Sequence, residues 1–489
     1  MKKYLSFLVF FLFLILLTSC GKNIRTIKIY NCVDYINEEV LDGFKDWFQE
    51  NYGEEIEVVY DTFETNESMY NTLRSGKTHY DLCCPSDYMI QKMQREGMLD
   101  PFDLENYNLD IYFENVSPYI KNIYDNNKLS DGLSWSNYAA CYMWGTLGII
   151  YNPENLGEAL DEIDEDGNYY YEVTSWLDFI KPEFKGMMSL KDSVRDSYCV
   201  AQILANIDEL NEHDNLDPSY NALIQDVINR RSDEDIQKAE IELRKMKPNL
   251  FGLEVDSAKG DIVTGKISMN LAWSGDAVYS IDLAEEEYIE LRYIVPEEGG
   301  NVWFDGWVTP KGADQELALA FINYISQPEM AKLNMDEIGY TSPIAGDAIY
   351  ELISEWYGID SLEEGENLED YNFVEFDLSF FFGDTLSEDY LSEGKALIQI
   401  EESYIGRQFS TQYPDEETLN RCGVMQDFEE QNEKVLQMWI NFRANKAPLA
   451  LIFALILFVV LCAVIALFSK KAYFERRLRA KKEKKINNQ

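Results

Sequence analysis

The sequence predicts an α/β protein that folds into two lobes, and three observations lead to this. Strand-like and helix-like segments alternate along the first hundred residues, an order typical of a largely parallel sheet. The chain has 489 residues, which is more than one hydrophobic core usually serves. Its 32 Tyr, 26 Phe and 9 Trp supply enough apolar surface to order it, which excludes a disordered chain.

The first block of the chain is expected to run strand, helix, strand, helix, strand and helix. Val40, Phe44 and Phe48 share one helical face, and Gly53 ends that helix. Ser86 is placed as the N-cap of the last helix. The expected elements are strands over 26–30, 56–60 and 81–84 and helices over 40–53, 69–73 and 86–94.

The rest of the chain continues the alternation as far as a helix over 429–442. A stretch over 350–404 is unusually acidic and aromatic, and we interpret it as an insertion whose acids form a solvated face. The other expected elements are strands over 148–151, 187–190, 267–273 and 291–295, helices over 175–179, 198–210, 233–245 and 317–325, and a loop over 338–340.

Two apolar segments flank this region. Lys2 and Lys3 precede the run Leu5 to Leu17, a pattern typical of a secretory signal peptide over residues 1–20. Cys20 follows the small residues at the cleavage point, so it is the predicted lipidation site of a lipoprotein. The region between Cys20 and the second apolar segment is expected outside the cytoplasm, in the periplasm or at the cell exterior.

The second apolar segment predicts one C-terminal transmembrane helix over residues 447–469. Its uncharged core, 449–468, has about the 20 residues that a helix needs to cross a bilayer. The tail 470–489 is rich in Lys and Arg and is therefore expected in the cytoplasm. Both segments predict a protein of the cell membrane whose large domain is extracytoplasmic.

Composition excludes several functions. The net charge of −46 disfavours binding to nucleic acid and favours cations. Only two histidines occur, His79 and His213, and neither accompanies a nucleophile motif, so catalysis by a Ser-His-Asp or Cys-His group is not expected. The cysteine spacings match no zinc site, and a Cys32–Cys84 bridge is a minor alternative to free thiols. No metal, cofactor or enzymatic activity is predicted.

The site is expected just after the first and third strands. Ligands of open parallel sheets bind beyond the carboxyl ends of the strands, which places residues 32–35 and 86–88 at the site.

Several motifs, in this order, resemble the polyamine-binding proteins of ABC transporters, the periplasmic receptors for spermidine and putrescine. The resemblance spans residues 26 to about 442. The matching stretches are 30–35 (YNCVDY), 66–70 (NESMY), 80–88 (YDLCCPSDY), 175–176 (SW), 181–186 (KPEFKG), 273–276 (WSGD), 300–305 (GNVWFD), 338–340 (IGY) and 413–415 (YPD).

The resemblance implies a two-lobed periplasmic-binding-protein-like fold of type II, with crossing hinge segments and the ligand held between the lobes. Crossings are implied near 142–145, near Asp305 and near Pro343. The implied lobes are 26–142 with 305–343 for lobe 1, and 143–304 with 344–446 for lobe 2.

Carried over by position, the resemblance implies an aromatic box, acidic contacts and a hydroxyl contact. The aromatic positions are Tyr35, Tyr88, Trp273, Trp303 and Tyr340; the acids are Asp34, Asp87, Asp196, Asp276 and Asp305; the hydroxyl is Ser86, and a late amide falls on Gln426 or is replaced by Met425. The first tryptophan of the family is Cys32 here, and another acidic position is Ser193 beside Asp192. These departures put selectivity for spermidine in doubt.

The chemistry of these residue types suits a polyamine. Ammonium groups removed from water need carboxylate partners, and methylenes beside a positive charge suit aromatic faces. The alternatives are that Tyr35 and Tyr88 are core aromatics, that Asp34 and Asp87 belong to a turn and a helix start, and that Asp196 pairs structurally with Arg195.

The sequence therefore predicts a membrane-anchored receptor that binds putrescine or spermidine and delivers it to an ABC permease with a cytoplasmic ATPase. The alternatives are a sensor of polyamine or another small cation that is read by a partner, a carboxylate-pair glycan hydrolase, and a receptor for another small ligand. The hydrolase is disfavoured because each candidate acid accompanies an aromatic suited to a cation.

Overall fold

The computed structural model describes residues 24–362 and 371–444. The chain divides into two compact units, Met1–Leu436 and Gln437–Gln489, and the architecture below is that of the first. The predicted signal peptide with Cys20, the transmembrane segment 447–469 and the tail 470–489 lie outside the described residues. Within the described ranges no helix is both long and apolar enough to cross a bilayer.

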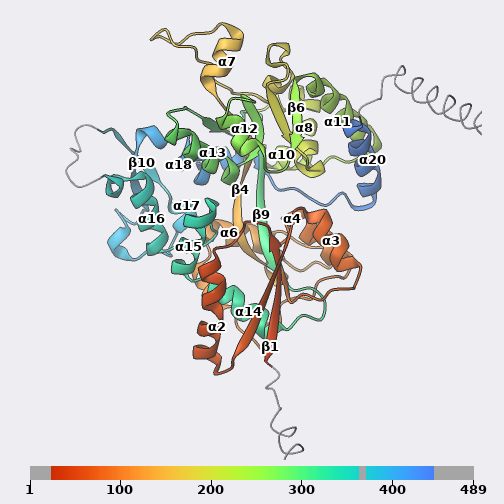
Figure 1. Ribbon diagram of the computed structural model, residues 1–489, viewed down its shortest axis with the longest axis vertical. Coiled ribbons are helices and arrows are strands. Elements are labelled where there is room, and N and C mark those ends of the chain that lie inside the picture. Colours follow the sequence, from red (N-terminus) through yellow and green to blue (C-terminus); the bar gives the residue numbers. More distant parts are fainter. Residues whose placement is uncertain (1–23, 363–370, 445–489) are drawn as a thin grey trace, which may run out of the picture. The chain divides into compact units, whose positions relative to one another are not determined.

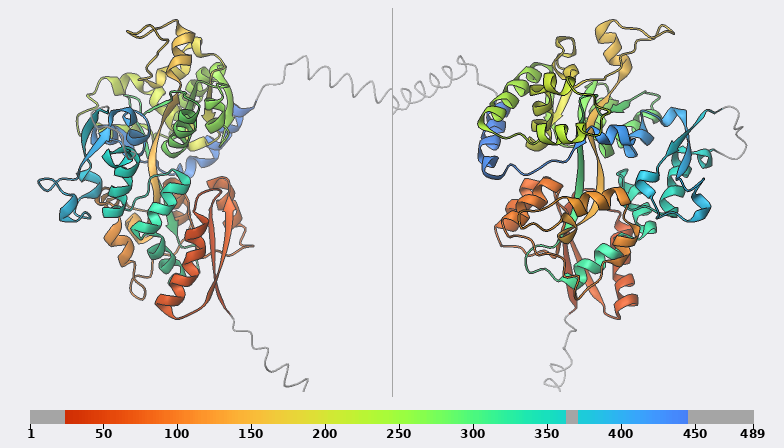
Figure 2. Two further views of the ribbon diagram at one scale, coloured as in Figure 1. Left: turned by 60° about the vertical axis from the view of Figure 1, so that its left-hand side comes forward. Right: turned by 180° about the vertical axis from the view of Figure 1, so that it is seen from behind.

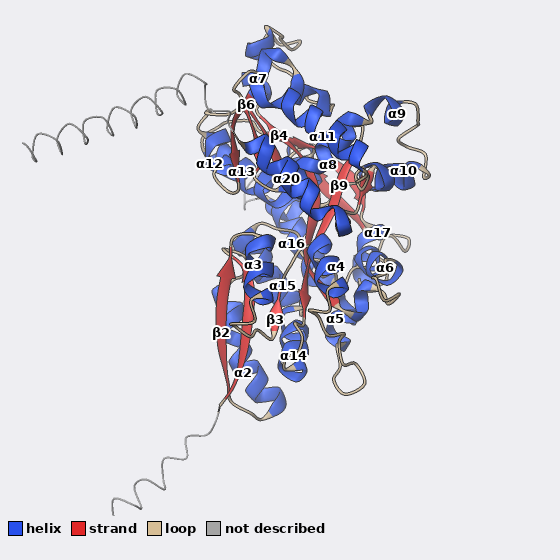
Figure 3. Ribbon diagram, turned by 90° about the vertical axis from the view of Figure 1, so that its right-hand side faces the viewer, coloured by secondary structure: helices blue, strands red, loops and turns tan. Residues whose placement is uncertain are grey.

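The first block folds largely as predicted. Strands β1 (Arg25–Cys32), β2 (Ile56–Phe63) and β3 (Leu82–Cys83) are parallel, with β1 between the other two. Helix α2 (Glu38–Tyr52) joins β1 to β2 and buries Val40, Phe44 and Phe48, and Gly53 caps it in the left-handed conformation. Helices α3 (Asn66–Arg74) and α4 (Asp87–Arg95) follow β2 and β3 (Figure 3).

A second group of parallel strands forms from the middle of the chain. Strands β5 (Met188–Lys191), β6 (Leu250–Glu254) and β7 (Met269–Trp273) pair in parallel, with α8 (Val194–Ala205), α11 (Asp233–Met246) and α13 (Ser274–Glu286) around them (Figure 1). The single helix predicted over 198–210 was wrong in its bounds: α8 ends at Ala205, and α9 (Ile207–Asn211) is separate. The helix predicted over 175–179 is a 3₁₀ turn, Trp176–Ile180.

Two long antiparallel strands join the two groups. Strands β4 (Ala139–Tyr151) and β9 (Gly300–Val308) pair along their length, and the main chain of Trp144 also bonds that of Thr341. The three predicted crossing segments therefore lie side by side. Within the described residues one ten-stranded sheet results, of order β2-β1-β3-β9-β4-β7-β5-β6. In the same sheet, β8 (Arg292–Ile294) pairs with β4, and β12 (Cys422–Gly423) pairs with β9. Figures 1 and 2 show β4 and β9 running between the two groups.

The resemblance implies a crossing near Asp305, and Asp305 belongs to the crossing strand β9. It lies in the middle of β9, opposite Met143 of β4. Gly300 is the first residue of this strand, and Gly306 follows Asp305 within it. The strand continues because β4 supplies main-chain partners along its whole length.

The remaining helices and strands lie around this sheet. They are α5 (Asp110–Asn115), α6 (Pro118–Asn126), α7 (Pro153–Leu160), α10 (Tyr220–Val227), α12 (Ala258–Val263), α14 (Gln315–Ile325), α15 (Pro328–Ile338), α16 (Asp347–Tyr357), β10 (Phe373–Asp377), α17 (Ser379–Phe382), β11 (Leu397–Glu401), α18 (Gln408–Gln412) and α19 (Glu416–Asn420). Helix α20 (Asn432–Arg443) contains the boundary between the two compact units.

The acidic stretch 350–404 is more than a solvated face. Strands β10 and β11 form an antiparallel hairpin, and α17 buries Phe381 and Phe382. Phe381 stacks on Trp144 of the crossing strand β4 at 5.8 Å between ring centroids. This stretch therefore contributes aromatic side chains to the core.

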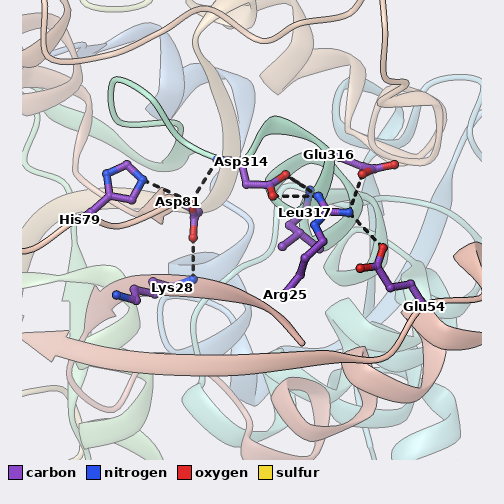
Figure 4. A network of polar contacts seen from close by, with 8 residues as sticks. All are labelled: Arg25, Lys28, Glu54, His79, Asp81, Asp314, Glu316 and Leu317. Atoms are coloured by element: carbon purple, nitrogen blue, oxygen red, sulfur yellow. Dashed lines mark hydrogen bonds and ion pairs between the residues drawn. The ribbon is translucent and has the colours of Figure 1, made fainter. Parts of the chain in front are cut away.

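A polar network fixes the start of β1 against α14 (Figure 4). Arg25 donates two hydrogen bonds of 2.8 Å to Asp314 and one of 2.7 Å to Glu316, in the first turn of α14. Asp81 accepts from the main-chain N–H groups of Lys28 and Asp314. These contacts join the first strand to a helix almost three hundred residues away.

The six cysteines among the described residues are free thiols, so Cys32 and Cys84 form no bridge. Their burial raises the pKa of each thiol, which keeps the sulfur protonated.

Candidate functional site

Asp305 is the centre of the candidate site. Its carboxylate accepts a hydrogen bond of 2.6 Å from Ser86 Oγ and one of 2.8 Å from Tyr35 Oη. Ser86 begins α4 as predicted, but its hydroxyl bonds Asp305 instead of capping the helix. Asn66 fixes Ser86 by donating to its Oγ and accepting from its N–H. Residues after β1 and β3 thus converge on one carboxylate in a crossing strand.

The electrostatics of Asp305 are unusual because its hydrogen-bond donors are neutral hydroxyls. Burial raises its pKa to about 6, although the hydrogen bonds from Ser86 and Tyr35 act in the opposite direction, and the charge of Asp196 adds to the rise. Burial and Asp305 also raise the pKa of Tyr35, which therefore stays a donor. Among residues 24–362 and 371–444, Asp305 forms no ion pair with a Lys, Arg or His.

Three aromatic rings lie beside this carboxylate. Tyr340 meets Tyr35 edge-to-face at 5.2 Å between centroids and lies 5.7 Å from Trp303. The indole N–H of Trp303 donates to the main-chain oxygen of Thr146. Tyr340 packs on the backbone of Gly275, where a Cβ atom would lie 2.2 Å from the ring. The structure thus brings three of the five predicted aromatics together.

The second carboxylate of the site, Asp276, differs from Asp305 in its partners. Tyr340 Oη donates to Asp276 Oδ1 at 2.8 Å, and Lys191 Nζ donates to Oδ2 at 2.7 Å. The Lys191 ammonium also lies 4.3 Å from the ring centroid of Trp273. We did not predict Lys191, because its acidic partners lie far along the chain, at Glu254 and Asp276.

Further acids lie near this centre without joining it. Asp87 is buried, and its Oδ1 accepts from the N–H of Tyr88. Tyr88 Oη donates at 3.2 Å to Glu67, which we did not predict as a site residue.

Asp196 is a further acid near this centre. Burial raises its pKa, whereas hydrogen bonds from Ser193 and Trp273 and the charges of Lys191 and Arg195 act to lower it.

Asp196 and Arg195 do not form the structural pair considered above. The Arg195 guanidinium donates to the main-chain oxygens of Gln426 and Ile228 and to Asn229 Oδ1. Arg195 is 1 % exposed, so this set of bonds supports the fold of α8 and the segment around Gln426.

Two predicted residues lie apart from the Asp305 centre. Asp34 is exposed in a turn and adopts a left-handed backbone conformation (φ 52°), which agrees with the alternative of a turn acid. Gln426 is exposed, and it bonds Arg195 and Asn229 through its main chain.

No set of three or more His, Cys, Asp or Glu side chains within the described ranges is arranged to hold a metal ion. The arrangement instead offers a carboxylate with neutral donors, surrounded by aromatic rings. Such a centre suits an organic cation.

Comparison with known proteins gives a consistent result. Residues 44–350 match the family described as bacterial extracellular solute-binding protein. The spermidine/putrescine-binding periplasmic protein of Escherichia coli is 30% identical over 322 residues, which cover 65% of this chain and 78% of that protein. A putrescine-binding periplasmic protein of Escherichia coli is 26% identical and covers 68% of this chain and 80% of its own length.

Solved structures show the same fold. A spermidine/putrescine ABC transporter substrate-binding protein of Streptococcus pneumoniae has a TM-score of 0.55 at 26% identity, with 86% of this chain and 98% of that chain covered. A lipoprotein of Treponema pallidum has a TM-score of 0.56 at 20% identity and covers 86% of this chain and 99% of its own. These matches confirm the predicted two-lobed α/β fold.

Proposed function

The chain belongs to the bacterial extracellular solute-binding proteins, and from this premise we propose that it is a receptor for polyamines. Members of such a family carry solutes and do not convert them, which confirms the prediction of a binding protein over an enzyme. We propose that putrescine or spermidine binds between the two lobes and is delivered to an ABC permease for import.

The observation that carries the proposal is the state of Asp305. A partly buried carboxylate that accepts only from hydroxyl groups lacks the counter-charge that normally offsets its desolvation. A ligand ammonium supplies that charge, and the rings of Tyr35, Tyr340 and Trp303 suit the adjoining methylenes. The names of the relatives independently point to spermidine and putrescine.

The proposal assigns a role to each predicted residue. Asp305, Ser86 and Tyr35 hold one ammonium, and Trp303 and Tyr340 line the aliphatic part. Trp273 and Asp276 form the second end of the proposed site, and Asp87, Tyr88 and Asp196 support it. Asp34 and Gln426 are exposed and apart from the Asp305 centre, so we propose for them only a place at its margin.

The location of the receptor is also part of the proposal. The signal peptide is cleaved immediately before Cys20, which carries a lipid. Lobe 1 comprises 26–142 and 305–343, and lobe 2 comprises 143–304 and 344–446. The segment 447–469 crosses the membrane and leaves 470–489 in the cytoplasm. A lipid and a spanning helix together give a firmer anchor than one acyl chain.

Calorimetric titration of the full-length protein with putrescine, spermidine and spermine tests the proposal. We expect saturable one-to-one binding of at least one of the three at physiological salt. Asp305→Asn is expected to weaken that binding at least tenfold more than Asp196→Asn, because the charges of Lys191 and Arg195 act on Asp196, whereas, within the described ranges, the groups that shift the pKa of Asp305 include no cation. Absence of binding by all three amines, or equal affinities of both variants and the wild type, contradicts the proposal.

A further inference from the structure

Lys191 places an ammonium of the protein itself within the proposed site. It is the last residue of β5, and 1 % of it is exposed. Its Nζ donates to Asp276 Oδ2 at 2.7 Å and to the main-chain oxygen of Val255 at 3.0 Å, and it lies 3.1 Å from Glu254 Oε1. Three acceptors thus surround an ammonium that has three protons.

The environment of Lys191 has the features expected for a bound polyamine ammonium. Two carboxylates neutralise the charge, and Trp273 covers it at 4.3 Å from the ring centroid. Burial acts to lower the pKa of Lys191, but the charges of Asp276 and Glu254 outweigh it and raise the pKa. The lysine is therefore charged at neutral pH.

Two tyrosines connect the position of Lys191 to Asp305. Tyr340 bonds Asp276 through its hydroxyl, and its ring contacts Tyr35, whose hydroxyl bonds Asp305. The two carboxylates therefore stand at either end of one pair of tyrosines. One of them has an ammonium partner within the chain, and the other has neutral partners.

We infer that Lys191 is a specificity-determining residue that occupies the Trp273–Asp276 position and limits the number of ammonium groups the site accepts. The inference rests on the proposed function. A ligand ammonium at this position would have to displace a buried lysine that makes two hydrogen bonds and two ion pairs, or lie beside a like charge, and both are unfavourable. A diamine held at Asp305 avoids the conflict, whereas a triamine extends a further charge toward Lys191.

Selectivity for putrescine over spermidine follows. We expect the full-length wild type to bind putrescine at least tenfold more tightly than spermidine in calorimetric titrations. In Lys191→Ala the position is vacated while Asp276, Glu254 and Trp273 remain. The ratio of the two dissociation constants is then expected to move at least tenfold toward spermidine.

Lys259→Ala is the matched control. Lys259 also feels the charge of Asp276, but its own ion pair is with Asp256 and its side chain is 27% exposed. Its removal changes the net charge by the same amount without vacating the Trp273–Asp276 position. We expect the ratio of dissociation constants to stay within twofold of the wild type.

The outcomes separate the inference from the proposed function. Putrescine binding with an unchanged ratio in folded Lys191→Ala, or equal affinities of the wild type for both amines, overturns the inference and leaves the receptor intact. Binding of neither amine by the wild type overturns both. If Lys191→Ala does not fold, Lys191→Ala/Asp276→Ala removes both charges, and loss of the preference for putrescine supports the inference while its persistence overturns it.

Discussion

At the scale of single residues, Asp305 is a carboxylate whose hydrogen-bond donors are all neutral. The hydroxyls of Ser86 and Tyr35 satisfy its oxygens without neutralising it, and burial holds its pKa near 6. The free protein therefore carries a charge that is better compensated once an ammonium arrives. A salt-bridged acid such as Asp276 offers a ligand no comparable gain.

The uncompensated charge of Asp305 is expected to lower the stability of the ligand-free protein. Burial raises the folded-state pKa of Asp305 to about 6, so ionisation at neutral pH costs up to about 3 kcal/mol of folding stability. The contribution of Asp305 to the free energy of unfolding is fully present below about pH 4. It is lost as the pH rises through about 6, because the carboxyl group then ionises in the folded protein. Asp305→Asn should therefore raise the melting temperature of the ligand-free protein at pH 7.5.

Thermal unfolding at pH 7.5 and pH 5 measures the effect, and the gain should be smaller at pH 5, where Asp305 is mostly protonated. Asp34→Asn makes the same chemical change on an exposed turn residue and should alter the free energy of unfolding by less than about 0.5 kcal/mol. A melting temperature of Asp305→Asn below that of the wild type at pH 7.5 would count against the electrostatic account.

At the scale of elements, the first turn of α13 packs so closely against the Tyr340 ring that it requires a glycine at position 275. A Cβ atom on Gly275 would lie 2.2 Å from the Tyr340 ring, which is too close for any contact. Gly275→Ala should push Tyr340 away from Asp276 and from Tyr35. We expect at least a tenfold loss of polyamine affinity in titrations, with about 1–3 kcal/mol of destabilisation from overpacking.

Gly260→Ala serves as the control for this prediction. Gly260 is also helical, in α12, but a Cβ atom added there would meet no atom within 4 Å. Its replacement should leave affinity unchanged and add up to about 1 kcal/mol of helix stability. Equal affinities of the two alanine variants would show that Tyr340 is not held as described.

Patterns of consecutive residues predicted those helices and strands that are determined by neighbouring residues in the chain. The face of Val40, Phe44 and Phe48 with the stop at Gly53 indicated α2, because an amphipathic period and a left-handed cap are written in consecutive residues. Strand β9 depends on pairing with β4, a distant segment of the chain, and no pattern of consecutive residues indicates that pairing.

The site was predictable only in part, for a related reason. Order and spacing of motifs indicated Tyr35, Ser86 and Asp305, which do meet. Lys191 was missed because its acidic partners lie 63 and 85 residues further along the chain, at Glu254 and Asp276. No short-range pattern announces such a contact.

At the scale of the whole molecule, the candidate site draws on distant parts of the chain. Tyr35 and Ser86 follow strands of the first group, Asp276 follows a strand of the second, and Asp305 belongs to a strand that joins them. A ligand that contacts all of them couples both groups, which is the basis for closure by hinge motion. The net charge of −46 would further attract a cationic ligand at low salt.

The most direct test of the central claim, that a ligand ammonium pairs with ionised Asp305, is proton release on binding. Putrescine is titrated calorimetrically at pH 6 and pH 8 into the wild type and Asp305→Asn, in buffers of different ionisation enthalpy. With a pKa of about 6, we predict release of about half a proton per ligand at pH 6 and almost none at pH 8. Tight binding without proton release at pH 6, or with the same release in Asp305→Asn, would contradict the account.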